Sequence, residues 1–100
     1  MTMTEPVVLI NAFEVPVGQA EHFIAAWEET RDFLQSQPGY IETALHQALT
    51  PDADFLFVNI ARWQTAEAFT AAIRSAGFRA SAAGLAGYPP HPSLYRIVRT

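Results

Sequence analysis

The chain has 100 residues, of which half are hydrophobic and 12% aromatic, enough to bury the core of one domain. Its net charge of −4, with no cluster of basic residues, argues against a nucleic-acid-binding protein. The absence of cysteine excludes disulfides, thiolate metal sites and cysteine nucleophiles. No signal-peptide pattern opens the chain and no run approaches the ~20 apolar residues of a membrane span, so we expect a cytoplasmic domain. Apart from a polar N-terminus, one domain should extend from about residue 6 to residue 99.

The first half of the chain predicts a strand, a helix and a second strand. Alternating apolar positions predict the first strand at residues 7–15, which Pro16-Val17-Gly18 should end. Apolar residues then recur at helical spacing over residues 19–37, with acidic residues mostly on the other side. Pro38-Gly39 should end this helix, and a strand is predicted for residues 40–48.

The second half has its strongest pattern at residues 55–66, FLFVNIARWQTA. A turn at residues 50–54 precedes this strand, and Gln64-Thr65 should cap a helix at residues 66–75. Ala76-Gly77 is expected to interrupt that helix. The remaining predictions are a short helix at 78–85, a turn-rich loop at 84–92 and a last strand at 93–99.

The strand at residues 55–66 places a polar amide among large apolar side chains. Side chains alternate along a strand, so one face should carry Phe55, Phe57, Asn59, Ala61 and Trp63, and the other Leu56, Val58, Ile60 and Arg62. Asn11 has a similar setting in the first strand. A buried, unpaired amide costs roughly 2–7 kcal/mol. Each asparagine is therefore either a structural tie or a functional group facing a pocket.

The order of elements predicts an α+β, ferredoxin-like βαββαβ fold with a four-stranded antiparallel sheet and helices on one face. The first and third strands should be central neighbours, with Asn11 near Asn59 and Trp63 on the same side, facing the helices. Apolar side chains should remain on the face that the helices leave uncovered, which suggests a homodimer packed sheet on sheet. These side chains are Val8, Ile10, Leu56, Val58 and Ile60.

Four motifs carry a resemblance to a known family. They are Ile10-Asn11-Ala12-Phe13, Gln37-Pro38-Gly39-Tyr40, the run from Phe57 to Trp63, and Glu67-Ala68-Phe69. With these motifs the chain resembles the antibiotic biosynthesis monooxygenases, dimeric α/β barrels built from this unit. It is most similar to the anthrone oxygenases of aromatic polyketide pathways, which use O₂ without metal, flavin or haem.

The resemblance implies that Asn11, Asn59 and Trp63 are the catalytic residues. The reaction would convert an anthrone-like polycyclic substrate and O₂ to a quinone, with no cofactor and no metal. Preorganised amide and indole N–H donors would stabilise the enolate oxygen. We expect substrate-binding positions at Phe13, Trp27, Phe57, Phe69 and His46.

Several alternatives stay open. His46 could instead be a general base, because its face on the second strand cannot be placed. An isomerase, cyclase or decarboxylase, or a non-catalytic small-molecule-binding dimer, are alternatives on the same fold. Haem degradation, found in another branch of the superfamily, is disfavoured because its tryptophan and ligating histidine would fall near Ala72 and Ala82. His22 and His91 are expected to be exposed, and the histidines have no metal-ligand spacing.

Overall fold

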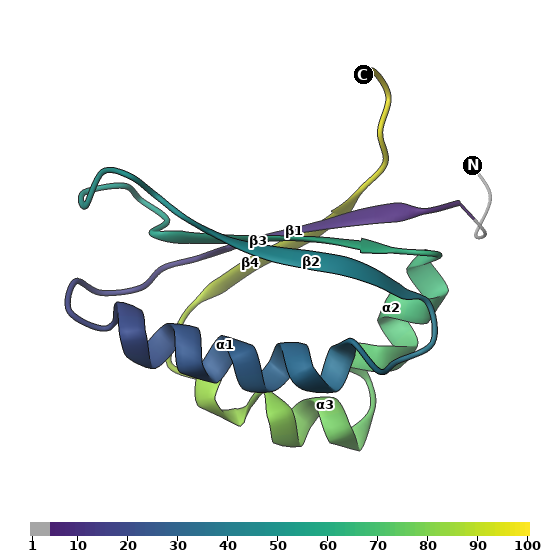
Figure 1. Ribbon diagram of the computed structural model, residues 1–100, viewed down its shortest axis with the longest axis horizontal. Coiled ribbons are helices and arrows are strands. Elements are labelled where there is room, and N and C mark those ends of the chain that lie inside the picture. The colour runs from purple at the N-terminus through teal and green to yellow at the C-terminus, as the bar shows by residue number, and fades with distance from the viewer. Residues whose placement is uncertain (1–4) are drawn as a thin grey trace.

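The computed structural model describes residues 5–100, and predictions about residues 1–4 lie outside them. Figure 1 shows a sheet with its helices on one side and the C-terminal segment leading away from the body. The strands are β1 (Val7–Phe13), β2 (Tyr40–Gln47), β3 (Phe57–Trp63) and β4 (Pro90–Tyr95). The helices are α1 (Ala20–Leu34), α2 (Ala66–Ile73), α3 (Ala76–Ser81) and a 3₁₀ turn, η1 (Ala83–Leu85).

The sheet has the strand order β2-β3-β1-β4, and each neighbouring pair is antiparallel. This arrangement confirms the predicted α+β, ferredoxin-like fold. The central pair, β1 and β3, places Asn11 directly opposite Asn59. The prediction that the two asparagines are cross-strand neighbours is therefore confirmed.

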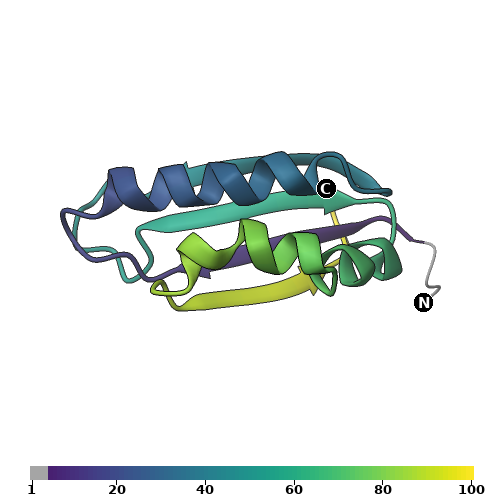
Figure 2. The same ribbon diagram turned by 90° about the horizontal axis from the view of Figure 1, so that it is seen from below.

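The helices cover one face of the sheet, as the two views show (Figures 1 and 2). Burial of aromatic side chains between the layers supplies most of the core. One buried cluster contains Phe13, Phe23, Trp27, Phe57 and Tyr88, and the other contains Leu9, Ala61, Trp63 and Ala72. No helix within residues 5–100 is long and apolar enough to cross a membrane.

Side-chain caps begin both short helices. The Thr65 hydroxyl accepts a hydrogen bond from the Ala68 N–H at 3.0 Å, which confirms the predicted cap. Ser75 caps α3 in the same way, through the Phe78 N–H. The predicted break between two helices is present, but it falls at Arg74 and Ser75, because Ala76 and Gly77 already form the first turn of α3. A glycine fits there because a Cβ would collide with the ring of Phe33.

The last strand is the other element whose position was predicted wrongly. β4 occupies residues 90–95, so it begins within the predicted loop and overlaps the predicted strand only at residues 93–95, and residues 96–100 extend away from the sheet (Figure 1). Prolines in GLAGYPPHP indicated a loop, but β4 is an edge strand that pairs only with β1. Proline is tolerated on an edge because an N–H on that side has no ladder partner to lose.

The alternation predicted for residues 55–63 fails at its start. A bend at Leu56 separates it from β3, and Leu56 packs against the core cluster instead of the uncovered face. Phe55 is 38% exposed, and its ring lies 5.0 Å from that of His91. From Phe57 onward the predicted alternation holds, with Phe57, Ala61 and Trp63 buried.

The opposite face of the sheet is left uncovered by the helices of residues 5–100 (Figure 1). Ile60 is 37% exposed there, and Val8, Ile10 and Val58 are half-buried. Arg62 forms an ion pair with Glu42 at 3.4 Å. This apolar face is the surface through which the homodimer is predicted to pack.

Candidate active site

The two strand asparagines lie side by side in the middle of the sheet and both face the helices. Asn11 on β1 and Asn59 on β3 occupy the same register position, and both line one cavity. An antiparallel pair brings opposed side chains within about 4.5–5.5 Å at Cβ. Two carboxamides therefore meet at one point of the cavity surface.

A neighbour on each edge strand fixes each carboxamide through its oxygen. Asn11 Oδ1 accepts a hydrogen bond from the backbone N–H of His91 at 3.0 Å. Asn59 Oδ1 accepts one from the Thr43 hydroxyl at 2.6 Å. Neither NH₂ group has a partner within residues 5–100, and neither nitrogen is a fully buried, unsatisfied atom. Both NH₂ groups are thus available as donors to a molecule in the cavity.

Trp63 lies at the end of β3, on the same face as the asparagines. Its side chain is 1% exposed and is held edge-on by Tyr40 and Phe69, each with a ring centroid 5.6 Å away. The Trp63 side chain also lines the cavity, and its indole N–H has no hydrogen-bond partner among residues 5–100. Aromatic packing therefore fixes the ring of a third residue of this cavity that carries an N–H donor.

The turn before β2 supports this arrangement. Gly39 has a φ of +89°, a left-handed conformation that favours glycine. A Cβ there would collide with the Cβ of Ala68, and the Gly39 carbonyl accepts a bond from the Gln64 N–H at 2.8 Å. Gly39 thereby lets α2 and the end of β3 pack closely around Trp63.

The cavity between the sheet and the helices has a volume of about 490 Å³, a usual size for a small-molecule site. Most of its lining is apolar or aromatic, and the polar groups gather on the sheet side. The lining residues of β1, β2 and β3 are Leu9, Asn11, Phe13, Tyr40, Thr43, Asn59, Ala61 and Trp63. The lining residues elsewhere include Trp27, Thr30, Arg31, Leu34, Phe69, Ile73, Phe78 and Tyr88.

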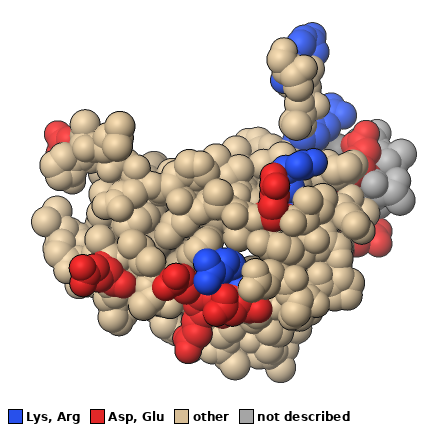
Figure 3. All heavy atoms as spheres, viewed as in Figure 1, with Lys and Arg blue, Asp and Glu red and all other residues tan. Residues whose placement is uncertain are grey.

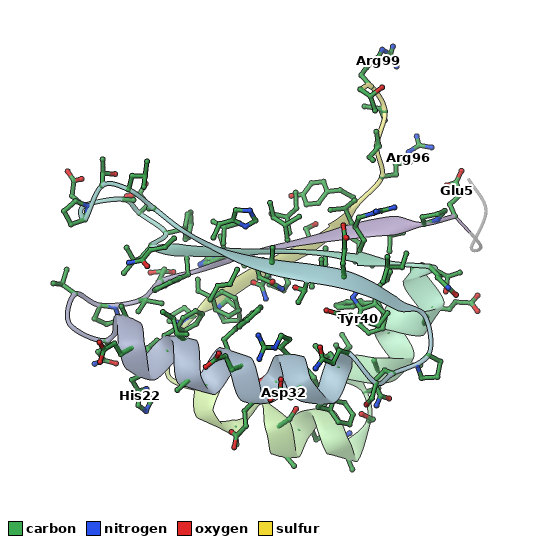
Figure 4. All side chains as sticks on the ribbon, viewed as in Figure 1. Glu5, His22, Asp32, Tyr40, Arg96 and Arg99 are labelled. Atoms are coloured by element: carbon green, nitrogen blue, oxygen red, sulfur yellow. The ribbon has the colours of Figure 1, made fainter. Side chains whose placement is uncertain are left out.

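Tyr40 lies between the sheet and the helices (Figure 4). Burial raises the pKa of Tyr40 above its usual 10.0, the positive charge of Arg31 lowers it in part, and Glu42 raises it further. The phenol is therefore neutral at physiological pH and keeps its O–H as a donor. No partner for that O–H lies within residues 5–100.

Comparison with known proteins agrees with this geometry. Residues 6–84 match the model of the family described as antibiotic biosynthesis monooxygenase. The chain belongs to this family. A curated relative, deoxynogalonate monooxygenase of Streptomyces nogalater, is 35% identical over 81 residues, which are 81% of this chain and 66% of that protein. The chain thus spans just under two thirds of that relative's length.

Solved structures of family members extend the similarity to nearly the whole chain. A protein of Shewanella loihica PV-4, provisionally named a monooxygenase, is 40% identical with a TM-score of 0.87, covering 99% of this chain and 100% of that one. SnoaB, a cofactor-independent oxygenase from Streptomyces nogalater, is 29% identical with a TM-score of 0.85, covering 96% of each chain.

The structure brings most of the residues expected in the family site to one cavity. Phe13, Trp27 and Phe69 line it together with the asparagines and Trp63. Phe57 faces the helices but does not line the cavity. Its ring instead stacks on Phe23 at 4.8 Å within the core.

His46 is not at the cavity. It pairs with Val58 across β2 and β3, and so shares the uncovered face of the sheet, where it is exposed. Residues of opposite parity on that strand, such as Thr43, face the cavity. The substrate-binding or general-base role considered for His46 therefore cannot operate in this cavity.

The sequence reasoning missed polar residues of the site, among them Thr43 and Arg31. Thr43 lies in β2, where the weak alternation did not reveal the inward face. Arg31 lies in the last turn of α1, among acidic residues that indicated a solvated surface. A helical projection could have found it, because Arg31 follows Trp27 by four residues and lies on the same side of the helix.

The other two histidines lie outside the cavity lining, exposed as predicted, but both have partners. His91 lies in β4 and not in a loop, and its Nε2 is 2.7 Å from Oε2 of Glu14. His22, at the start of α1 (Figure 4), bonds the Tyr88 hydroxyl at 2.5 Å, and Tyr88 donates to Gln19. Within residues 5–100, no three His, Asp or Glu side chains are grouped to hold a metal ion.

Proposed function

We propose that the protein is a cofactor-independent monooxygenase that oxidises an anthrone-like polycyclic aromatic substrate to a quinone with O₂. The observation that carries the proposal is that Asn11, Asn59 and Trp63, whose side-chain N–H groups have no partner within residues 5–100, line one largely apolar cavity. Family membership and the similarity to SnoaB, itself named a cofactor-independent oxygenase, support it. A cavity of about 490 Å³ has room for a fused-ring substrate.

The reaction begins with loss of a proton from the CH₂ group that lies opposite the carbonyl in the central ring. The resulting enolate gives one electron to O₂, and the substrate radical and superoxide combine to a peroxide at that carbon. Protonation of the peroxide and loss of water leave the second carbonyl of the quinone. The substrate supplies the electrons, one oxygen atom enters the product, and the other leaves as water.

The described residues of the cavity supply donors and no strong base. None of the lining residues is Asp, Glu or His. The proposed role of the asparagines and Trp63 is therefore to stabilise the enolate oxygen, which lowers the pKa of the substrate C–H group. Such donors gain strength where water is excluded, and one of them is typically worth about 2.7–4 kcal/mol in the transition state.

The proposal includes a homodimer packed through the uncovered face of the sheet. The half-buried side chains Val8, Ile10 and Val58, with the more exposed Ile60, provide the apolar surface. Contiguous exposed apolar surface of this kind usually marks an interface. The cavity lies on the other side of the sheet, so each protomer would keep its own site.

The test is oxygen uptake by the purified protein with a simple anthrone, in air-saturated buffer with a chelator and no added cofactor. The proposal expects one O₂ consumed for each quinone formed, at a rate proportional to enzyme and above the slow autoxidation of the anthrone. Conversion without O₂ uptake would assign an isomerase or decarboxylase instead. Tight binding without any turnover would assign a binding protein.

A further inference from the structure

One charged side chain lines the cavity. Among its lining residues in the described part of the chain, Arg31 alone carries a formal charge. This is notable because the chain carries ten acidic and six basic residues, and none of the acidic ones lines the cavity. A cation at the edge of an apolar site attracts an anion more strongly than it would in bulk water.

Arg31 is held in place by two neighbours on α1. Its Nε and Nη2 donate to Asp32 Oδ1 at 3.1 and 3.0 Å, and its guanidinium lies 5.4 Å from the Trp27 ring centre. Within residues 5–100, Nη1 has no partner. The guanidinium is therefore oriented by its helix while one of its NH₂ groups remains available to a ligand.

The position of Arg31 complements the asparagines. Arg31 belongs to the helix layer and the donors belong to the sheet layer, so they lie on opposing sides of one cavity. Its side chain is 33% exposed, which places it where the cavity meets solvent. Figure 3 shows a hollow in this face beside a basic side chain that is bordered by acidic ones.

We infer that Arg31 binds an anionic substituent, a carboxylate or a phenolate, on the part of the aromatic substrate that lies away from the enolate oxygen. This inference rests on the proposed function and names the substrate class of the same cavity. A polycycle that spans the cavity would place its enolate oxygen at Asn11 and Asn59 and its anionic group at the free Nη1 of Arg31.

Asp32 and Glu28 bear on the strength of this binding. The Asp32 carboxylate binds the guanidinium of Arg31, and a carboxylate oxygen of Glu28 lies 3.9 Å from Nη2 of Arg31. A bound anion would therefore lie near two carboxylates. The Asp32 side chain is 62% exposed and does not line the cavity. Its negative charge opposes an anion bound at the same guanidinium, so removing that charge should strengthen anion binding without changing the shape of the cavity.

The experiment uses two unreactive ligands of the same shape, anthraquinone-2-carboxylate and anthraquinone-2-carboxamide. Their dissociation constants are measured by calorimetry on the intact wild-type protein. We expect the carboxylate to bind about 10- to 100-fold more tightly than the carboxamide, the usual range for a hydrogen bond to a charged group. This preference should shrink as salt rises, because a partly exposed ion pair is screened.

Three variants separate the charge of Arg31 from a structural role. Arg31→Gln should abolish the preference while binding the carboxamide as wild type does. Asp32→Asn should increase the preference, and it keeps the test valid if Arg31→Gln does not fold. The matched control is Arg74→Gln, an exposed arginine that follows α2 outside this cavity and should leave both constants unchanged.

Equal binding of the two ligands by the wild-type protein would overturn the inference, as would an equal loss of both in Arg31→Gln. A preference that does not respond to Asp32→Asn and survives Arg31→Gln would also overturn it. The proposed function fails separately. If anthrone and O₂ give no turnover but the carboxylate preference follows Arg31 and Asp32, the anion site stands and the oxygenase assignment falls.

Discussion

Replacing Asn59 by alanine should remove one of the donors that face the cavity and leave the protein folded. Asn59→Ala deletes an NH₂ group that has no partner among residues 5–100, together with an oxygen that accepts one bond, from Thr43 at 2.6 Å. If the NH₂ group stabilises the enolate, its loss raises the energy of the transition state more than that of bound substrate. We therefore expect kcat and kcat/KM to fall together while KM changes little.

The magnitude follows from the kind of interaction removed. Loss of a single oxyanion-hole donor lowers kcat by about 10²–10³-fold, which corresponds to about 2.7–4 kcal/mol. Asn11 and Trp63 keep their donors, so residual turnover should remain. The free energy of unfolding should fall by only about 1 kcal/mol, since one hydrogen bond is lost and the half-buried Thr43 hydroxyl can reach water.

Thr43 provides a second measurement on the same amide. Thr43→Val keeps the side-chain shape but removes the hydroxyl that holds Asn59 Oδ1, so the amide can turn away from the substrate. We expect about a twofold to tenfold loss in kcat/KM, the value of one net hydrogen bond. In the Asn59→Ala background the same change should have no further effect, because the group that Thr43 positions is gone.

The assay is steady-state oxygen uptake, with urea unfolding of each variant measured in parallel. Asn59→Asp is the most discriminating variant, since it keeps the shape but places an anion where negative charge must develop. Turnover near the wild-type rate by a folded Asn59→Asp protein would refute the donor role. A loss of stability of several kcal/mol in Asn59→Ala with normal kcat would instead make Asn59 a structural residue.

Three further predictions concern the dimer, a turn and a phenol. The wild-type protein should scatter light as a dimer of the 11.0 kDa chain, and Val58→Lys should give monomers because it places an unpaired charge in the interface; a monomeric wild type would contradict this. Gly39→Ala should lower the free energy of unfolding by about 3 kcal/mol, from left-handed strain plus collision with Ala68. Gly18→Ala adds left-handed strain without a collision and should lower the free energy of unfolding by about 1–2 kcal/mol. Equal losses of stability in the two variants would rule out the collision at Gly39. Burial raises the pKa of Tyr40 in the folded state, so this group's contribution to stability is complete below pH 10.0 and is lost as the pH rises further. Tyr40→Phe lacks the titrating hydroxyl. Its melting temperature should therefore fall less between pH 9 and 11.5 than that of the wild type.

The fold was predictable because its main elements have strong local patterns. The alternation of β1 and β3 and the helical spacing in α1 each indicated one structure, and their order led to the ferredoxin-like sheet. The failures came where tertiary packing outweighs local signals. Gly77 indicated a break, yet the break falls two residues earlier, at Ser75, and Gly77 lies in the first turn of α3, where it packs against the ring of Phe33. The prolines of β4 indicated a loop, yet an edge strand accepts them.

The site was predictable only on the strands with clear alternation. Asn11, Asn59 and Trp63 could be placed on one face because β1 and β3 alternate strictly and pair in the centre of the sheet. β2 is an edge strand with a register shift between Tyr40 and Glu42, so its sequence does not show which side chains turn inward. For this reason Thr43 was missed and His46 could not be placed on either face.

The direction of the two amides is a tertiary property, and it decides their chemistry. A carboxamide can donate or accept, so an asparagine in a sequence does not specify which it offers to a ligand. The backbone N–H of His91 can only donate, which requires the oxygen of Asn11 to turn toward β4 and its NH₂ group toward the cavity. Proline has no backbone N–H, so within Pro90-His91-Pro92 only His91 can donate this hydrogen bond. The unusual Pro-His-Pro edge of β4 therefore makes Asn11 a donor, as the stabilisation of an enolate requires.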